Sequence, residues 1–119
     1  MWRIETAPEF DPELLALDPE VRIELFAQAR LIQQFGPRAK RPRIDTLKGS
    51  KHANMKELRF DAAGGVWRMA FAFDPKRRAI LLVAGDKSGV KEGRFYKELI
   101  DRADARFDAH LARLRKEGG

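Results

Sequence analysis

Residues 56–84 read KELRFDAAGGVWRMAFAFDPKRRAILLVA and hold three short apolar stretches separated by turn sequences. The first two stretches, 56–61 and 66–73, alternate between the two faces of a strand, which is typical of strands with one buried face. The third, 79–84, is an unbroken aliphatic run. The intervening AAGG and DPKRR sequences are too short for crossover connections, so these stretches predict an antiparallel three-stranded sheet.

The segments on either side of this sheet predict one further strand and three helices. Residues 2–6 (WRIET) alternate like a short strand, and the DPE sequences at 11–13 and 18–20 each offer an acidic N-cap followed by a first-turn proline. After the sheet, apolar side chains recur at helical spacing from 95 to 114. This order predicts an α+β fold: a small twisted antiparallel sheet, two N-terminal helices packed on one face, and a C-terminal helix.

We expect a single domain spanning residues 1–119, because a chain of this length can bury a sizeable core without disulfides or metals. Segment 37–54 contains two prolines, a glycine and many charges, so we expect it to be a loop. The predicted core combines the apolar face of the second helix with the buried faces of the strands, and consists of Val21, Leu25, Phe26, Ala29, Ile32, Leu58, Met69, Phe71, Ile80, Leu82 and Val83.

The composition excludes several kinds of site. There is no cysteine, which rules out disulfides and thiolate metal sites, and the two histidines, His52 and His110, stand in no metal-ligand spacing. We therefore expect no metal and no cofactor. No apolar run approaches the about 20 residues of a membrane span, and the first residues do not resemble a signal peptide. We expect a soluble cytoplasmic protein without membrane contacts.

Positive charge is concentrated in the middle of the chain. The net charge is +6, and residues 37–60 alone hold eight basic and two acidic side chains. Such a segment is the footprint expected for a polyanionic partner, although an ordinary solvated surface accounts for charge of this kind equally well.

Alternation along the predicted strands places part of this charge on the sheet face away from the N-terminal helices. Leu58 and Met69 point into the core, so Glu57, Arg59 and Arg68 point to the opposite, open face. In an ordinary hairpin register the two arginines are neighbours on adjacent strands. The alternative is that all three are solvated strand positions in which Glu57 pairs with an arginine.

A basic loop leads into this face. It contains Lys48, Lys51 and His52, Lys56 follows at the start of the strand, and Lys87 lies at the rim after the last strand. Dispersed positive charge on a concave sheet face suits the phosphates of a single nucleic-acid strand. We therefore expect the three lysines at 48, 51 and 56 to bind RNA.

Taken in order, the sequences KELRF…GVWRMAFAF, ILLVAGDKSG and EGRFYKELIDRAD resemble the RelE/ParE superfamily of toxins from type II toxin–antitoxin systems, and within it the HigB-like, phage-derived branch. The resemblance covers nearly the whole chain. It implies a RelE-like fold and a ribosome-dependent mRNA endoribonuclease that inhibits translation. In such an enzyme the ribose 2′-hydroxyl attacks the adjacent phosphate without a metal, which leaves a 2′,3′-cyclic phosphate and a 5′-hydroxyl.

The resemblance also implies roles for individual residues. Arg68 follows the aromatic residue of the family's strand motif and is assigned to the scissile phosphate, where Arg59 joins it. Lys87 stands where the family has a basic residue after the last strand. Tyr96 lies near the tyrosine that stacks on a base in some members, with core packing as the alternative. Where RelE has lysines, this chain has Glu57, which could orient an arginine or act as a base.

His52 is the only imidazole near the predicted face, and its ordinary pKa of ~6.5 suits proton transfer. A catalytic role for His52 is one interpretation, and an exposed loop histidine is the other.

The partners implied by the resemblance are the ribosome, messenger RNA and a cognate antitoxin, a helix-turn-helix protein encoded beside this gene. Contact with DNA is then only indirect, through the antitoxin. A basic face is also a natural landing site for an acidic partner segment. Two other functions remain open. One is a ParE-like inhibitor of DNA gyrase, and the other is a catalytically decayed module that binds RNA or protein, which Glu57 favours.

Overall fold

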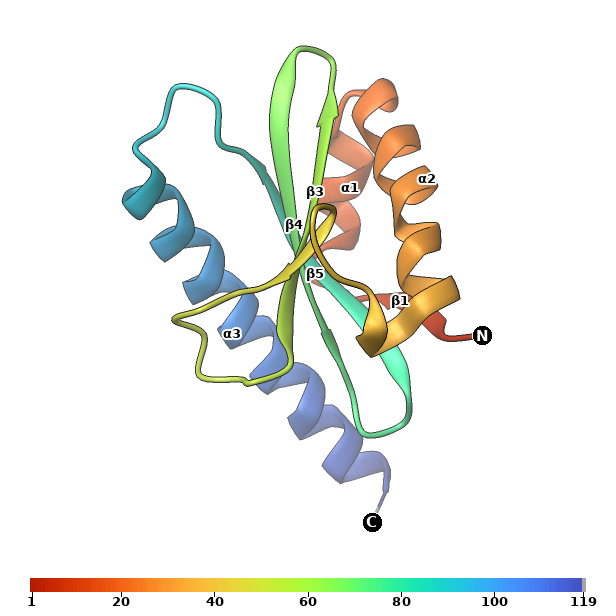
Figure 1. The fold of residues 1–119 in the computed structure, drawn as a ribbon. Coiled ribbons are helices and arrows are strands. Elements are labelled where there is room, and N and C mark those ends of the chain that lie inside the picture. Colours follow the sequence, from red (N-terminus) through yellow and green to blue (C-terminus); the bar gives the residue numbers. More distant parts are fainter. Residues whose placement is uncertain (119) are drawn as a thin grey trace.

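The computed structural model describes residues 1–118, in which five strands form one sheet with helices on both faces (Figure 1). The elements follow one another as β1 (Arg3–Thr6), α1 (Asp11–Ala16), α2 (Pro19–Phe35), the 3-10 turn η1 (Gly36–Arg38), β2 (Ile44–Thr46), β3 (Met55–Ala62), β4 (Gly65–Phe73), β5 (Arg78–Asp86) and α3 (Glu92–Glu117). The predicted α+β fold is confirmed. Within residues 1–118, no helix is both long and apolar enough to cross a membrane.

The sheet is mixed rather than wholly antiparallel. Its strands lie in the order β1-β5-β4-β3-β2, and the hairpins β3–β4 and β4–β5 are antiparallel as predicted. β1 lies parallel to β5, from Arg3 opposite Arg78 to Thr6 opposite Leu81. Two helices and three strands separate β1 from β5, so the chain has the length that a parallel connection requires.

Segment 37–54 is not entirely a loop, contrary to expectation. Residues 44–46 form the short edge strand β2, in which Ile44 lies opposite Leu58 and Asp45 lies opposite Glu57. Three residues carry too little alternation to stand out among prolines and charges. The strand forms because the Ile44 side chain is buried in the core while its backbone pairs with β3.

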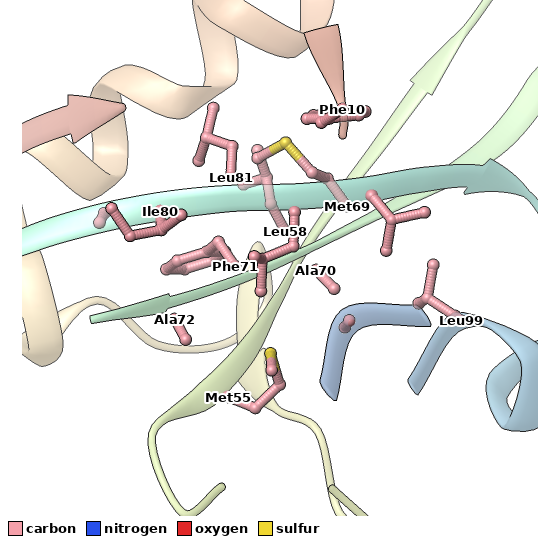
Figure 2. Close-up of a cluster of buried hydrophobic side chains, with 14 of the residues drawn as sticks. Phe10, Met55, Leu58, Met69, Ala70, Phe71, Ala72, Ile80, Leu81 and Leu99 are labelled. Atoms are coloured by element: carbon pink, nitrogen blue, oxygen red, sulfur yellow. The ribbon is translucent and has the colours of Figure 1, made fainter. Parts of the chain in front are cut away.

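α1 and α2 cover one face of the sheet, and α3 crosses the other face over β5 and β4 (Figure 1). In Figure 2, Phe10 and Met69 lie on one side of the sheet, whereas Ala70 and Leu99 lie on the other. Ala70 and Ala72 are fully buried, and their small side chains let α3 approach β4. The face expected to be open is therefore largely covered by α3, and Glu57, Arg59 and Arg68 lie at its end nearest the start of α3.

The predicted core is confirmed except at one position. The buried members are Val21, Leu25, Ala29, Ile32, Leu58, Met69, Phe71, Ile80, Leu82 and Val83. The prediction for Phe26 is wrong, since this side chain is 43% exposed. Successive helical residues are rotated by about 100°, so Phe26 lies beyond the stripe that faces the sheet.

The two DPE sequences start helices in different ways. Asp18 is the N-cap of α2 and accepts a hydrogen bond of 2.8 Å from the Glu20 backbone N–H. Asp11 was expected to cap α1, but Phe10 occupies that position, and Asp11 instead accepts a bond of 2.5 Å from the Thr6 hydroxyl. The N-cap of α1 is therefore one residue earlier than the sequence indicates, and Asp11 is the first residue of the helix.

Candidate functional site

A cluster of polar side chains lies on the α3 side of the sheet. Arg59 on β3 lies directly opposite Arg68 on β4, which confirms that the two arginines share a face. Glu57 is two residues along β3 on the same face, because side chains alternate across a strand. Tyr96 reaches the cluster from the first turns of α3, and Lys87 follows β5. We call these five residues the arginine–glutamate cluster.

Glu57 is the centre of the cluster and is only 3% exposed. Its Oε1 accepts a hydrogen bond of 2.8 Å from the Tyr96 hydroxyl. Its Oε2 accepts two from Arg59, from Nε at 3.2 Å and from Nη2 at 3.0 Å. The Arg68 Nε lies 3.7 Å from Oε1 and donates to the Tyr96 hydroxyl oxygen at 3.2 Å. One buried carboxylate thus bridges two guanidinium groups and a phenol.

The two arginines differ in exposure. The Arg68 side chain is 11% exposed and is held by a further bond of 2.9 Å from Nη1 to the Trp67 carbonyl oxygen. The Arg59 side chain is 31% exposed and has a second carboxylate, Asp45 on β2, at 3.5 Å. Burial acts to lower the pKa of Arg59, but the hydrogen bond and charge of Glu57 outweigh it and raise that pKa.

Tyr96 is held in its neutral form. Burial and the hydrogen bond to Glu57 raise the pKa of the Tyr96 phenol, and the bond from Arg68 opposes them only in part. The Lys87 ammonium lies 5.9 Å from the centre of the Tyr96 ring and 3.1 Å from the Glu92 carboxylate. The Tyr96 ring packs against the edge of the core, as the second interpretation expects, and its hydroxyl belongs to the cluster, while stacking on a base stays a prediction.

His52 and Lys51 lie outside the arginine–glutamate cluster and contact Asp108 on α3. The His52 Nε2 is 2.8 Å from Asp108 on α3, and its ring packs edge-on against Phe107 with centroids 4.9 Å apart. Lys51 forms an ion pair with the same Asp108. Because Asp108 is twelve positions beyond Tyr96 on α3, the two lie about 18 Å apart along the helix axis. The structure does not bring His52 into the cluster.

The remaining predicted RNA-binding lysines also stand apart from the cluster. Lys56 pairs in register with Thr46 and Phe71, which places it on the face that α1 and α2 cover, and its Nζ donates to the Thr46 hydroxyl at 2.9 Å. Lys48 is exposed on the loop between β2 and β3. That loop is tied to α3, because Asp104 accepts a bond of 2.5 Å from the Ser50 hydroxyl.

A second polar cluster, which the sequence did not indicate, is buried at the other end of α3. Asp74 accepts bonds from His110 Nε2 at 2.9 Å and from Arg78 Nε at 3.0 Å. Burial acts to raise the pKa of Asp74, but these bonds outweigh it and lower that pKa. Arg78 also bonds to Glu5 on β1 at 3.1 Å, so this cluster joins β1, β5 and α3.

Every cation of the arginine–glutamate cluster already has an anion. Arg59 and Arg68 share Glu57, and Lys87 has Glu92. An anionic ligand would therefore exchange with these carboxylates. The cluster offers charge for a developing oxyanion, a carboxylate that can accept a proton, and a phenol that can donate one. Among residues 1–118, no group of three or more His, Asp or Glu side chains is arranged to hold a metal ion.

Sequence reasoning missed Asp45, because β2 was not predicted, and could not position Tyr96. The small residues Ala70 and Ala72 were an available signal. Both alanines point to the same face as Arg68, whereas the large residues that alternate with them point to the opposite face. Small side chains on one face of a strand indicate where a helix can cross the sheet closely.

Comparisons with known proteins place the chain among toxin-related sequences. Residues 12–108 match the family described as "Phage derived protein Gp49-like (DUF891)". Two Mycobacterium tuberculosis proteins provisionally named as toxins are similar. HigB2 is 44% identical over 102 residues, which are 85% of this chain and 50% of HigB2. HigB3 is 39% identical over 105 residues, which are 88% of this chain and 90% of HigB3. The chain thus spans about half the length of HigB2.

A solved structure shares the fold. A double arginine-to-alanine variant of the E. coli toxin RelE, in the free state, superposes with a TM-score of 0.57 over 83% of this chain and 93% of that chain. The two sequences are 12% identical, so this likeness concerns the fold alone.

Proposed function

The chain belongs to the phage-derived Gp49-like family, and from that premise we propose that it is the HigB-like toxin of a type II toxin–antitoxin system. The proposal is supported by two relatives that are provisionally named as toxins and by the fold shared with RelE. Its partners are then an antitoxin encoded beside the gene, the ribosome and messenger RNA, and its place of action is the cytoplasm. DNA is reached only through the antitoxin.

The proposed activity is metal-independent cleavage of messenger RNA on the ribosome. The observation that carries it is the arrangement of Arg59 and Arg68 on either side of the Glu57–Tyr96 pair. The two guanidinium groups would bind the scissile phosphate and stabilise the charge that builds on it. Both come from rigid strands, which suits their placement on a phosphate.

Proton transfer is assigned to Glu57 and Tyr96. The ribose 2′-hydroxyl gives its proton to the Glu57 carboxylate and attacks the phosphorus, the bond from phosphorus to the 5′-oxygen breaks, and Tyr96 gives its proton to that oxygen. The products are a 2′,3′-cyclic phosphate and a 5′-hydroxyl. Glu57 then returns a proton to the Tyr96 phenolate along their 2.8 Å hydrogen bond, which restores both groups. The Tyr96 phenol is protonated at neutral pH and so has a proton to give, and its raised pKa makes it a weaker acid than a free tyrosine, which the charge building on the leaving oxygen must offset.

Translation in a purified system tests the proposal. Ribosomes programmed with a defined mRNA are incubated with the protein, and the RNA ends are mapped. Cuts that require the ribosome and carry 5′-hydroxyl and 2′,3′-cyclic phosphate ends are expected. RNA that remains intact would contradict the enzymatic part of the proposal.

One specific observation favours a second function, a binding module without catalysis. Because the single carboxylate of the cluster, Glu57, already pairs with both arginines, it competes with a phosphate for them, as expected of an inactive site. The same reaction separates the candidates. Ribosome binding without cleavage supports the silent module, and cleaved DNA trapped on gyrase in a parallel reaction supports a ParE-like inhibitor.

A further inference from the structure

An apolar groove of about 330 Å³ lies between the end of α2, the η1 turn and β2. Five apolar side chains and three basic ones line it: Leu31, Phe35, Ala39, Pro42, Ile44, Arg38, Lys40 and Arg43. Phe35 is 43% exposed at the last turn of α2, although it is one of the largest apolar residues of the chain. A half-exposed phenylalanine beside an apolar hollow is a typical anchor point for a partner's side chain.

The basic rim of this groove has no counter-charge of its own. Arg38, Lys40 and Arg43 are exposed, and none of them forms an ion pair with residues 1–118. The neighbouring basic residue, Arg41, does pair, with Asp45 at 3.7 Å. The segment 37–43 contributes four basic and no acidic side chains, so it carries positive charge that the fold leaves available.

The groove faces away from the arginine–glutamate cluster. Ile44 is paired with Leu58 and points to the α2 side of the sheet, whereas Asp45 is paired with Glu57 and points to the α3 side. A partner in the groove therefore leaves Arg68 and Tyr96 uncovered. The groove nevertheless lies next to the cluster, because the backbone carbonyl of Arg43, a groove residue, accepts a bond of 2.7 Å from the backbone N–H of Arg59.

We propose that this groove binds an acidic segment of a protein partner, with one large apolar side chain of the partner beside Phe35 and its carboxylates against Arg38, Lys40 and Arg43. The proposal rests on the proposed function, under which the partner is the antitoxin. Charge complementarity around an apolar centre is the arrangement that protein interfaces use. A nucleic acid fits less well, because the hollow offers one aromatic side chain for stacking and apolar walls where base edges need hydrogen-bonding groups.

Titration calorimetry with the purified antitoxin and the full chain tests the proposal. The groove variant carries Arg38→Glu and Arg43→Glu. The control carries Arg115→Glu and Lys116→Glu, two exposed residues of the last turn of α3, and has the same change in net charge. Thermal melting of each variant establishes that it is folded. We expect the groove variant to bind at least about tenfold more weakly and the control to stay within about twofold.

Phe35→Ala provides a second variant without a change in charge, and it should also weaken binding about tenfold. Cleavage of mRNA by either groove variant, measured without antitoxin, should stay at the level of the unaltered protein. If the groove variants bind the antitoxin as tightly as the control, the groove is refuted while the antitoxin partnership stands. If the unaltered protein does not bind the antitoxin, both the groove proposal and the proposed antitoxin partnership are refuted. Loss of binding to a single-stranded RNA oligonucleotide, with antitoxin binding intact, overturns the proposal in favour of a nucleic acid.

Discussion

Replacing Glu57 with glutamine removes the one buried charge on which the arginine–glutamate cluster depends and keeps the shape of the side chain. Glutamine retains a single acceptor oxygen, whereas the carboxylate accepts from Tyr96 and twice from Arg59. The variant therefore leaves either Arg59 or Tyr96 without its acceptor. It also leaves Arg68, whose side chain is 11% exposed, without an anion nearby.

The magnitude follows from these contacts. Removing one partner of a fully buried ion pair costs about 3–5 kcal/mol, and a hydrogen bond to a charged group contributes about 1.5–3 kcal/mol. Arg59 keeps solvent contact and Asp45, and Arg68 keeps the Trp67 carbonyl oxygen, so the cost lies below the first range. We expect the free energy of unfolding to fall by about 1.5–3 kcal/mol.

Urea denaturation measures this change, and a loss of about 2 kcal/mol lowers the midpoint by about 1 M for a domain with a slope of about 2 kcal/mol per molar. The matched control is Glu92→Gln, which breaks the ion pair with Lys87 where the Glu92 side chain is 72% exposed, and it should cost at most about 0.5 kcal/mol. The Glu57 variant should also cut mRNA about 10²–10⁴-fold more slowly, as expected for loss of a general base. Equal stabilities of the two variants would refute the central position given to Glu57.

Four further outcomes are expected. Arg68→Ala should slow mRNA cleavage about 10²–10³-fold and abolish growth arrest while antitoxin binding persists, and a folded variant that stays fully toxic would argue for the gyrase-type function. Tyr96 is the sole tyrosine of the chain, so near-ultraviolet absorbance reports its ionisation directly. The midpoint of this titration should lie above the ordinary value of ~10, and it should fall in the Glu57→Gln variant. Because the pKa of Tyr96 is higher in the folded protein than in the unfolded chain, the protonated phenol stabilises the fold fully below pH ~10, and this stabilisation is lost as the pH rises through the folded pKa. Asp74→Asn should lower the free energy of unfolding by about 2–4 kcal/mol at neutral pH. Because the pKa of Asp74 is lowered in the folded protein, the difference in unfolding free energy between the variant and the unaltered protein should shrink below about pH 3.9, where acid protonates Asp74, and a difference that is constant at all pH values would contradict this. Phe71→Ala should cost about 3–5 kcal/mol in calorimetric melting, and an unchanged melting temperature would mean that the core is assigned to the wrong strand face.

The part of the site that alternation controls could be predicted from the sequence. Side chains repeat every second residue in a strand, so a buried Leu58 and Met69 require Arg59 and Arg68 to share the other face. The bond between Tyr96 and Glu57 joins residues 39 positions apart and depends on how α3 crosses the sheet. No local sequence pattern determines that crossing, so the sequence could not decide whether Tyr96 belongs to the site or packs in the core.

His52 shows the limit of arguing from proximity in sequence. It precedes β3 by only a few residues, which suggested that it joins the arginines. An extended strand advances about 3.3 Å per residue, so a loop before β3 and Arg59 in the middle of that strand are well separated. The loop then packs on α3 through Asp104 and Asp108, which no spacing in the sequence indicates.

The parallel pairing of β1 with β5 also determines when the sheet can be completed during synthesis of the chain. Arg3 must wait for Arg78, 75 positions later, before β1 can join the sheet, and closing so large a loop slows folding. Tyr96 leaves the ribosome later still. A nascent chain that has emerged only as far as β5 holds both arginines and Glu57 but lacks the phenol to which they bond. If this chain acts on ribosomes, its active site is completed only after most of the protein has left the one that made it.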